Sequence, residues 1–379
     1  MGLLSKLGLI AAALIAVGFQ VYLKQATWLG LGIGRSIQPL SDFPYDCRRI
    51  DNDPRLQACE DMWLSENSRV LYLACSDPIA RTQWLPNNHK LNVTGRSQKD
   101  AIVALQIDAP SGKSFEYTTL QPSNYAGTAG DGLLSLVGMT GVDVSVDGEE
   151  DRVELLLVNA RPSLDSVGQI SLSQAAGANA TIEVFEVRGR HSATMNHLHT
   201  VAHKDITTPN NVALASGSRT RFYTTNDHGA HKVGLMAHLG GFLNVGNVVL
   251  CTVGQGCRVV SEGHKFPNGL AQHGGFVYVP SSMTGVIQVY RIKEDDELEK
   301  VEDIVIDYSL DNLSVDANGD IYVAAFPKGI DILLAFNDPL HAKPRSTIFR
   351  VRKGQTEATR RLFLSGVISP FITVCEPRP

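Results

Sequence analysis

The stretch that decides the fold is Asp311-Asn312-Leu313-Ser314 followed by Asp320-Ile321-Tyr322-Val323, an acidic and amide segment that precedes a β-branched and aromatic strand. Four more segments share this pattern, and they begin at Glu60, Thr140, Asn210 and Asn268. Self-similarity at an irregular period of about 45 to 80 residues predicts a radial or stacked array of sheets.

The acidic and amide residues of these repeats are expected to converge. In a propeller, equivalent positions of successive blades point at one shared axis although they are far apart in the sequence. These positions are Glu60, Asn210, Asn268, Asp311 and Asn312. Taken singly, Asn and Asp are ordinary turn formers. Taken together, oxygen ligands that meet at one point predict a site for a hard cation.

Length and composition fit a single all-β domain. The chain has 379 residues and 43% hydrophobic content, enough to bury a large core. A six-bladed β-propeller takes roughly 300 to 350 residues, and we assign it residues 40–379. Between the repeats, short strands and glycine-rich turns dominate. The net charge of -5 provides no basic face, so nucleic acid is not an expected partner.

The first 25 residues form a separate segment. Leu7–Leu23 is almost wholly apolar and lies between Lys6 and Lys24, as in a signal peptide or a short signal anchor. A buried helix of the fold is the alternative interpretation. We expect residues 1–25 to direct the chain to the secretory pathway, either secreted or anchored on the luminal side. Membrane association would then involve residues 7–23.

Six cysteines fit an oxidising compartment. A disulfide between Cys47 and Cys375 would tie the first strand to the last blade. The stretch 362–379 is short for a full final blade. We therefore expect the last blade to lack a strand or to borrow one from the segment around Cys47. Cys251 and Cys257 could bridge across a glycine turn or stay as thiols, and the same alternatives hold for Cys59 and Cys75.

Two glycosylation sequons support a luminal location. They are Asn92-Val93-Thr94 and Asn179-Ala180-Thr181, both in polar, loop-like surroundings. We therefore predict glycans at Asn92 and Asn179.

One long connection has the pattern of a lid. In residues 228–249, Leu235, Met236, Leu239 and Leu243 recur at near-helical spacing, although Gly240-Gly241 interrupts the pattern. We expect a short amphipathic helix over the binding site.

Taken together, the chain resembles the serum paraoxonase/arylesterase family of calcium-dependent lactonases, in its fungal-looking branch. The strings that carry the resemblance are Glu60-Asp61, Leu157-Val158-Asn159, Phe222 to His228, Glu262-Gly263 with Phe266 to Gly269, and Asp311 to Asp316. The resemblance implies a six-bladed propeller with a central calcium site and a hydrophobic N-terminal helix that is not cleaved.

The resemblance also implies the metal ligands. The axial Ca2+ of the family falls on Glu60, Asn210, Asn268, Asp311 and Asn312. A second, structural Ca2+ would use Asp61, a main-chain oxygen near Val142, and Asn211. Asn211 is an amide where the family has a carboxylate, and the lost charge predicts that this second ion is weak or absent.

The family's pair of catalytic histidines has no counterpart in this chain. The resemblance places these two positions at Thr140 and Ala160, and neither residue accepts a proton near neutral pH. Substitute candidates are Asp143 and His228, with His197 and His199 from neighbouring loops. Each of them is also readily explained as a structural residue.

Three functions follow from this pattern. In the first, the axial Ca2+ acts as a Lewis acid and a lactone or aryl ester is hydrolysed. In the second, the pocket catalyses a non-hydrolytic cyclisation or cycloaddition of secondary metabolism by proximity. In the third, the propeller only binds a ligand. Each takes a small apolar substrate or ligand, while its identity and the oligomeric state are not predicted.

Overall fold

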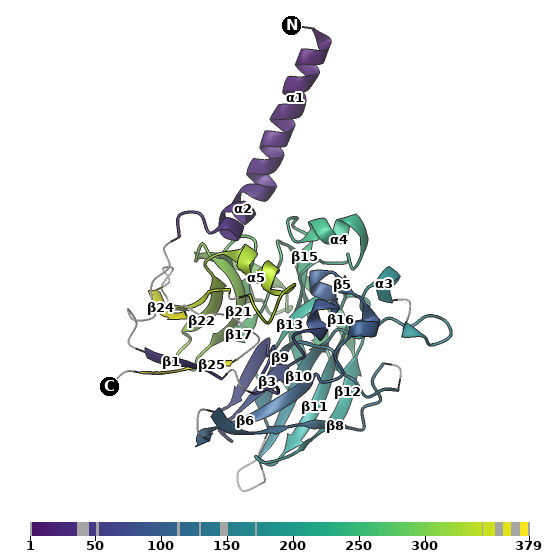
Figure 1. Cartoon of the computed structure of the whole chain (residues 1–379), viewed down its shortest axis with the longest axis vertical. Coiled ribbons are helices and arrows are strands. Elements are labelled where there is room, and N and C mark those ends of the chain that lie inside the picture. Colours follow the sequence, from purple (N-terminus) through teal and green to yellow (C-terminus); the bar gives the residue numbers. More distant parts are fainter. Residues whose placement is uncertain are drawn as a thin grey trace.

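The structure is a computed structural model, and it describes residues 2–35, 45–50, 53–111, 114–128, 130–144, 151–170, 173–342, 344–352, 359–364 and 372–377. The strands form a ring of sheets, and a long N-terminal helix projects from one end of the ring (Figure 1). The fold is a β-propeller with an apolar N-terminal helix, in agreement with the sequence.

Five sheets of four or five strands make up the ring. The first sheet contains β2 (Asp61–Ser65), β3 (Val70–Cys75), β6 (Ala101–Ser111) and β7 (Ser114–Thr119). The second contains β9 (Leu136–Asp143), β10 (Arg152–Asn159), β11 (Thr181–Arg188), β12 (Thr194–Val201) and β8 (Gln121–Ser123). All pairs in these sheets are antiparallel except β12 with β8.

The remaining three sheets repeat the same four-stranded order. The third contains β13 (Pro209–Leu214), β14 (Arg221–Asn226), β15 (Gly246–Thr252) and β16 (Gly256–His264). The fourth contains β17 (Ala271–His273), β18 (Phe276–Pro280), β19 (Val286–Ile292) and β20 (Leu298–Val305). The fifth contains β21 (Ser309–Val315), β22 (Ile321–Phe326), β23 (Ser346–Val351) and β24 (Thr359–Leu364).

Five inner strands surround the axis in the described part of the chain. Contacts run from β2 to β9, β13, β17 and β21 in turn. Asn312 Nδ2 of β21 then donates to the main-chain oxygen of Glu60, 3.2 Å away, which joins the fifth sheet to the first. Among the described residues, five full sheets surround the axis, one fewer than the six blades that the sequence predicts.

A two-stranded sheet occupies the place of a further blade. β1 (Tyr45–Ile50) pairs antiparallel with β25 (Ile372–Pro377), and the pair lies between the last and first sheets in Figure 1. The C-terminal strand thus borrows its partner from the segment around Cys47, as predicted. Ile50 is buried with Leu73 and Val103 of the first sheet.

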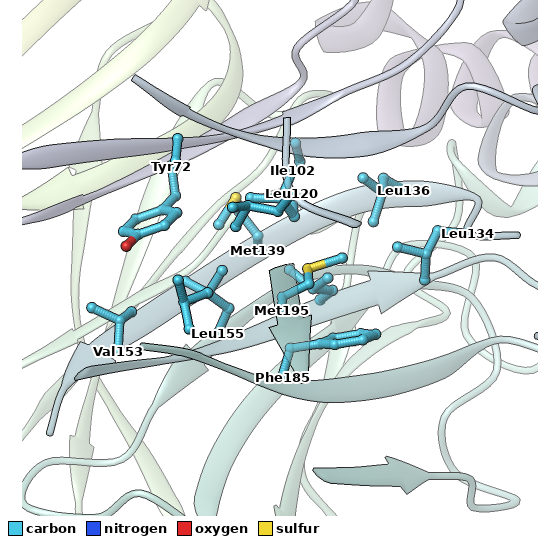
Figure 2. Close-up of a cluster of buried hydrophobic side chains, with 14 of the residues drawn as sticks. Tyr72, Ile102, Leu120, Leu134, Leu136, Met139, Val153, Leu155, Phe185 and Met195 are labelled. Carbon is cyan, nitrogen blue, oxygen red and sulfur yellow. The ribbon is translucent and has the colours of Figure 1, made fainter. Parts of the chain in front are cut away.

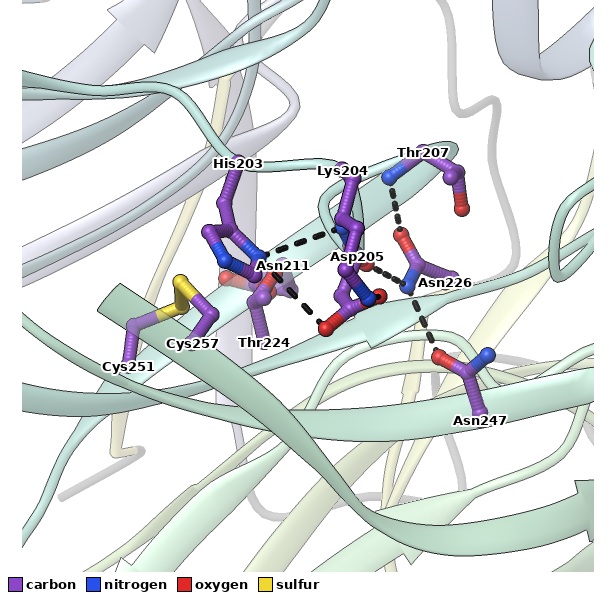
Figure 3. Close-up of a disulfide and its surroundings, with 10 residues drawn as sticks. All are labelled: His203, Lys204, Asp205, Thr207, Asn211, Thr224, Asn226, Asn247, Cys251 and Cys257. Atoms are coloured by element: carbon purple, nitrogen blue, oxygen red, sulfur yellow. Dashed lines mark hydrogen bonds and ion pairs between the residues drawn. A yellow bond between two sulfur atoms is a disulfide. The ribbon is translucent and has the colours of Figure 1, made fainter.

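Two disulfides settle alternatives that the sequence left open. Cys59 is bonded to Cys75 in the first sheet, and Cys251 is bonded to Cys257 across β15 and β16 (Figure 3). Cys47 is the backbone partner of Cys375 in the β1 and β25 register. The side chains of Cys47 and Cys375 lie outside the described residues, so that bridge stays a prediction.

The core consists of apolar layers between neighbouring sheets. Between the first and second sheets, Tyr72, Leu155, Phe185 and Met195 are buried together (Figure 2). Strand residues alternate between the two faces of a sheet, and each sheet is covered on both sides in the ring. This explains the nearly continuous apolar run Leu155–Val158 in β10.

The N-terminal helix is exposed along most of its length. α1 (Leu3–Gly18) continues through a π-helical turn (Phe19–Leu23) into α2 (Lys24–Leu31). The run Leu3–Leu31 is long and apolar enough to cross a membrane, a test that a signal sequence also passes. Ala26 and Leu29 of α2 are buried, and α2 packs against α5 (Gly329–Ala335).

The connections between the second and third strands of the sheets gather at one end of the propeller, which we call the upper end (Figure 1). They include α3 (Ser173–Ala176), α4 (Gly234–Gly240), α5, and the small sheet of β4 (Trp84–Leu85) and β5 (Lys90–Leu91). α4 confirms the predicted short helix in residues 228–249. Each inner strand also starts at this end, since consecutive strands run in opposite directions.

Candidate active site

The acidic and amide residues of the repeats meet at the axis near the upper end. Asn211 Nδ2 donates to Asn312 Oδ1 at 2.9 Å, and Asn312 in turn reaches the main chain of Glu60. Asn268 forms a side-chain hydrogen bond with Asp311. Four repeats therefore converge as the sequence predicted, and we call this set the axial cluster: Glu60, Asp61, Asn210, Asn211, Asn268, Asp311 and Asn312.

Burial disfavours the ionised form of two carboxyl groups in the axial cluster, those of Asp61 and Asp311. Burial raises the pKa of Asp61 to about 7, although hydrogen bonds from Met139, Met62 and Asn211 oppose the shift, and the charge of Asp311 adds to it. Burial likewise raises the pKa of Asp311 to about 6. A cation at the axis would stabilise both carboxylates.

One cation of the protein itself lies at this site. The guanidinium of Arg81 forms an ion pair with Glu60, and the Arg81 side chain is only 11% exposed. Burial lowers the pKa of Arg81, while the charges of Asp100 and Asp311 raise it. Arg81 could not be predicted from the repeats, because it lies in the connection between β3 and β6, outside the repeated segments.

The donor atoms of the axial cluster suit a calcium ion. Glu60 and Asp311 provide carboxylates, and Asn210, Asn268 and Asn312 provide amide oxygens, the ligand types that Ca2+ prefers. Among the described residues, no three His, Cys, Asp or Glu side chains are grouped to hold a metal. A cation here would thus depend on the amides together with the carboxylates of Glu60 and Asp311.

The residues expected at the second calcium site are brought together only in part. Asp61 contacts Asn211, and its two oxygens accept hydrogen bonds from the main-chain amides of Met62 and Met139, at 2.9 and 2.7 Å. The main chain next to Asp61 is that of Met139, whereas Val142 lies three residues further along β9 and pairs with Glu154. These hydrogen bonds occupy both oxygens of Asp61, and the weak second site stays a prediction.

Glycine explains which part of β9 faces the axis. A Cβ atom on Gly138 would lie 2.6 Å from the main-chain oxygen of Asn210, so only glycine fits there. Gly141 faces Trp63 instead. The residue before the axial glycine is therefore Val137 rather than Thr140, and neither side chain is a base.

Three of the four substitute catalytic candidates lie away from the axial cluster. Asp143 accepts a 2.5 Å hydrogen bond from Ser65, which is four residues, or about 13 Å, along β2 from Asp61. His197 and His199 lie on β12, the fourth strand out from the axis, and His197 contacts the buried Glu183 at 3.1 Å. Asp143 thus links the inner strands of the first two sheets at their far ends from Asp61, and His197 belongs to the outer strand of the second sheet.

His228 is the candidate that the fold brings to the axial cluster. Its Nδ1 atom lies 2.7 Å from Oδ1 of Asp227, and both side chains are buried. Oδ2 of Asp227 accepts hydrogen bonds from Asn210 at 3.2 Å and from Asn87 at 2.6 Å. Asp227 therefore links His228 directly to the axial residue Asn210.

Two further histidines adjoin His228. The ring of His89 packs against the rings of His228 and His238, with centroids 5.0 and 4.3 Å apart. The ring of Phe266 also packs against that of His228. Burial lowers the pKa of His89 to about 4, and repulsion by His228 and His238 contributes. The sequence singled out His228 but gave no signal that His89, from a distant connection, would lie beside it.

One connection crosses the axis at the upper end. Residues 76–100, which we call the first-sheet connection, carry Arg81, Asn87 and His89. Within it, Trp84 Nε1 donates to the main-chain oxygen of Ala160 at 2.9 Å, and Lys90 Nζ donates to Asn337 Oδ1 at 2.5 Å. The first-sheet connection thus contacts the second, third and fifth sheets and covers the axial cluster.

Comparison with known protein families identifies the family of this chain. The model of the family described as Arylesterase matches residues 170–362, just over half of the chain. This chain belongs to the arylesterase family. In this arylesterase-family chain, the matched region contains Asn210, His228, Asn268 and Asp311, and Glu60 precedes it.

One curated relative matches about half of the chain. Serum paraoxonase/lactonase 3 of Oryctolagus cuniculus is 29% identical over 187 residues, which are 48% of this chain and 50% of the relative. The arylesterase-family chain thus spans about half the length of the curated relative that it matches.

Among the solved structures, the first described below supports the fold alone, and the second is reported only as a weaker likeness. One, described as a gluconolactonase, is similar with a TM-score of 0.50 and 12% identity, covering 88% of this chain and 92% of that one. A gluconolactonase of Xanthomonas campestris gives a TM-score of 0.44 at 13% identity, covering 88% and 90%.

Proposed function

We propose that this arylesterase-family chain is a calcium-dependent hydrolase of lactones or aryl esters, acting on a small apolar carbonyl compound. The observation that carries the proposal is the hydrogen bond from Asn210 to Asp227, which joins the axial cluster to the buried His228 and Asp227 pair. A cation site and a proton acceptor are thereby held side by side.

The axial cluster would hold the cation through Glu60, Asn210, Asn268, Asp311 and Asn312. When bound, Ca2+ supplies Lewis-acid polarisation of a carbonyl oxygen. Asn210 contributes in two ways, because its amide nitrogen donates to Asp227 and its carbonyl oxygen is then left for the cation. Asn268 Nδ2 donates to Ser282 Oγ at 3.0 Å, while its Oδ1 accepts from the amide of Gly269 at 2.9 Å and keeps one lone pair for a cation.

His228 would accept the proton of the attacking water. A carboxylate next to Nδ1 fixes the ring orientation and the tautomer that leaves Nε2 as acceptor, and it stabilises the imidazolium that forms. Asp227 provides this contact at 2.7 Å and is itself held by Asn87 and Asn210. His228 would therefore replace the histidines that are absent at Thr140 and Ala160.

The surroundings favour an apolar substrate. Leu235, Met236 and Leu239 of α4 are exposed at the upper end, and Phe266 packs against His228. Apolar side chains around a few fixed polar groups are typical of small-molecule sites.

A second candidate function is a non-hydrolytic cyclisation in the same pocket. It is favoured by Thr140, Val137 and Ala160, which leave β9 and β10 without a base at the axis. In that case His228 would orient the substrate, and proximity would supply the rate.

Hydrolysis assays separate the two functions. We expect turnover of phenyl acetate or δ-valerolactone that is lost with EDTA and restored with Ca2+. Asp311→Asn should reduce this turnover at least about 100-fold because it removes a ligand charge. The control Asp303→Asn, at an exposed carboxylate paired with Lys300, should behave as wild type. Tight Ca2+ binding without hydrolysis would exclude the first function and favour the second.

The same proposal includes a location in the secretory pathway. The apolar helix Leu3–Leu31 and the two disulfides support it, and the side chains of Asn92 and Asn179 are exposed. We propose that residues 7–23 associate with a membrane and that both asparagines carry glycans. A mass shift on glycosidase treatment that disappears in the Asn92→Gln, Asn179→Gln double variant would test the glycans.

A further inference from the structure

The ion pair between Arg81 and Glu60 places a fixed positive charge at the axial cluster. Glu60 is one of the two carboxylates that would bind Ca2+, and Asp311, the other, also feels the charge of Arg81. The affinity of an oxygen site for Ca2+ follows the number of its ligand charges. With Arg81 in place, one of the two negative charges of the ligand set is already balanced.

The position of Arg81 is built into the first-sheet connection. Asp77 Oδ1 accepts hydrogen bonds from the amides of Ile79 and Ala80, at 2.9 and 3.0 Å, and so starts the helical turn Ala80–Thr82. Arg81 Nη1 also donates to the main-chain oxygen of Ala58 at 3.3 Å. These contacts direct the guanidinium toward the axis.

A disulfide holds the segment of Glu60 next to the start of the connection that carries Arg81. Cys59, which precedes Glu60, is bonded to Cys75 at the end of β3, where the first-sheet connection begins. The amide of Ser76 also donates to the main-chain oxygen of Gln57 at 3.2 Å. Glu60 and the start of the Arg81 segment are therefore held together.

We propose that Arg81 is an intrinsic counter-ion of the axial cluster that competes with Ca2+ for Glu60 and thereby sets a low calcium affinity. This inference rests on the calcium site of the proposed function. Because a guanidinium and Ca2+ repel each other at such short range, the ion displaces Arg81 from Glu60 when it binds. The first-sheet connection, which also carries Asn87 and His89 to the His228 pair, then loses one of its contacts to the axis.

Calcium titration calorimetry on the full chain tests the competition. Arg81→Gln should bind Ca2+ at least about tenfold more tightly than wild type, which corresponds to about 1.4 kcal/mol. Arg81→Lys keeps the charge and should stay within about threefold of wild type. The matched control Arg291→Gln removes an exposed arginine paired with Glu299 and should leave the affinity unchanged. Circular dichroism melts establish that each variant is folded.

The outcomes separate this inference from the proposed function. Tight binding by Arg81→Gln, including the case where wild type shows no measurable binding, supports the competition. Equal or weaker binding by Arg81→Gln overturns it while the calcium site stands. No binding by either protein at millimolar Ca2+ overturns both the site and the competition.

Hydrogen exchange on the wild-type protein provides a test that needs no variant. If Ca2+ displaces Arg81, amides in residues 77–85 should exchange faster with Ca2+ than with EDTA, while amides next to Asn268 and Asp311 should exchange more slowly. Slower or unchanged exchange in residues 77–85 would contradict the displacement.

Discussion

Two histidine and aspartate pairs in this chain have the same contact distance and opposite surroundings. His228 Nδ1 lies 2.7 Å from Asp227, and His341 Nδ1 lies 2.7 Å from Asp338. The side chain of His228 is 5% exposed, and that of His341 is 82% exposed. The difference in burial, rather than the contact itself, separates a candidate for catalysis from a surface pair.

The physical reason is the dielectric environment. In a buried site a hydrogen-bonded pair interacts strongly, and its partners cannot be replaced by water. Asp227 is held by Asn87 and Asn210, so that the orientation of His228 is fixed before a substrate arrives. An exposed pair contributes roughly 0 to 1 kcal/mol to stability.

The largest expected effect in this comparison is on turnover. His228→Gln should lower kcat for lactone or ester hydrolysis by about 100-fold to 10,000-fold, because a positioned general base typically contributes this much. The matched change His341→Gln should leave kcat unchanged. Steady-state kinetics at saturating Ca2+ measures both, and equal turnover of the two variants would remove His228 from the mechanism.

The next effect is on stability. Asp227→Ala leaves His228, Asn87 and Asn210 without their acceptor in a buried site, and it should lower the free energy of unfolding by about 3 to 5 kcal/mol. Asp338→Ala should change that free energy by no more than about 0.5 kcal/mol. Urea titrations compare the two, and a small loss for Asp227→Ala would mean that water reaches the site.

The smallest effect concerns pH. The pKa of His89 is lowered to about 4 in the folded protein, below its usual 6.5, so its neutral form is favoured on folding. Its contribution to stability is complete above pH 6.5 and decreases as the pH falls toward 4, because the unfolded chain binds the proton first.

His89→Asn should therefore lose less stability than wild type between pH 7 and pH 5. Part of the loss will persist, because burial also lowers the pKa of His264 to about 4. His341→Asn should follow wild type, and urea titrations at the two pH values make the comparison. An identical loss in wild type and His89→Asn would show that His89 stays accessible to protons in the folded state.

Part of the axial cluster could be predicted because it is encoded in repeats. Asn210, Asn268 and Asp311 each come just before or at the start of a β-branched strand, so the periodicity places them at equivalent positions around the axis. The same reasoning failed at β9, where Gly138-Met139 and Gly141-Val142 offer two similar registers. The choice between them depends on the close approach of Gly138 to Asn210, which is a contact between two sheets.

The number of blades depended on a similar long-range contact. Composition and length predict a propeller but are compatible with five or six sheets. The structure describes five full sheets and the two-stranded pair of β1 and β25, whose strands lie near opposite ends of the chain.

By itself, the sequence determined the all-β class, the radial arrangement, the apolar N-terminal helix and most of the oxygen donors at the axis, because periodic patterns and local strand signals encode them. Only the tertiary structure decided that Arg81, Asn87 and His89 lie over these donors and that His228, not Asp143, is next to them. These residues lie in irregular connections, whose positions follow from packing between distant sheets and have no local signal.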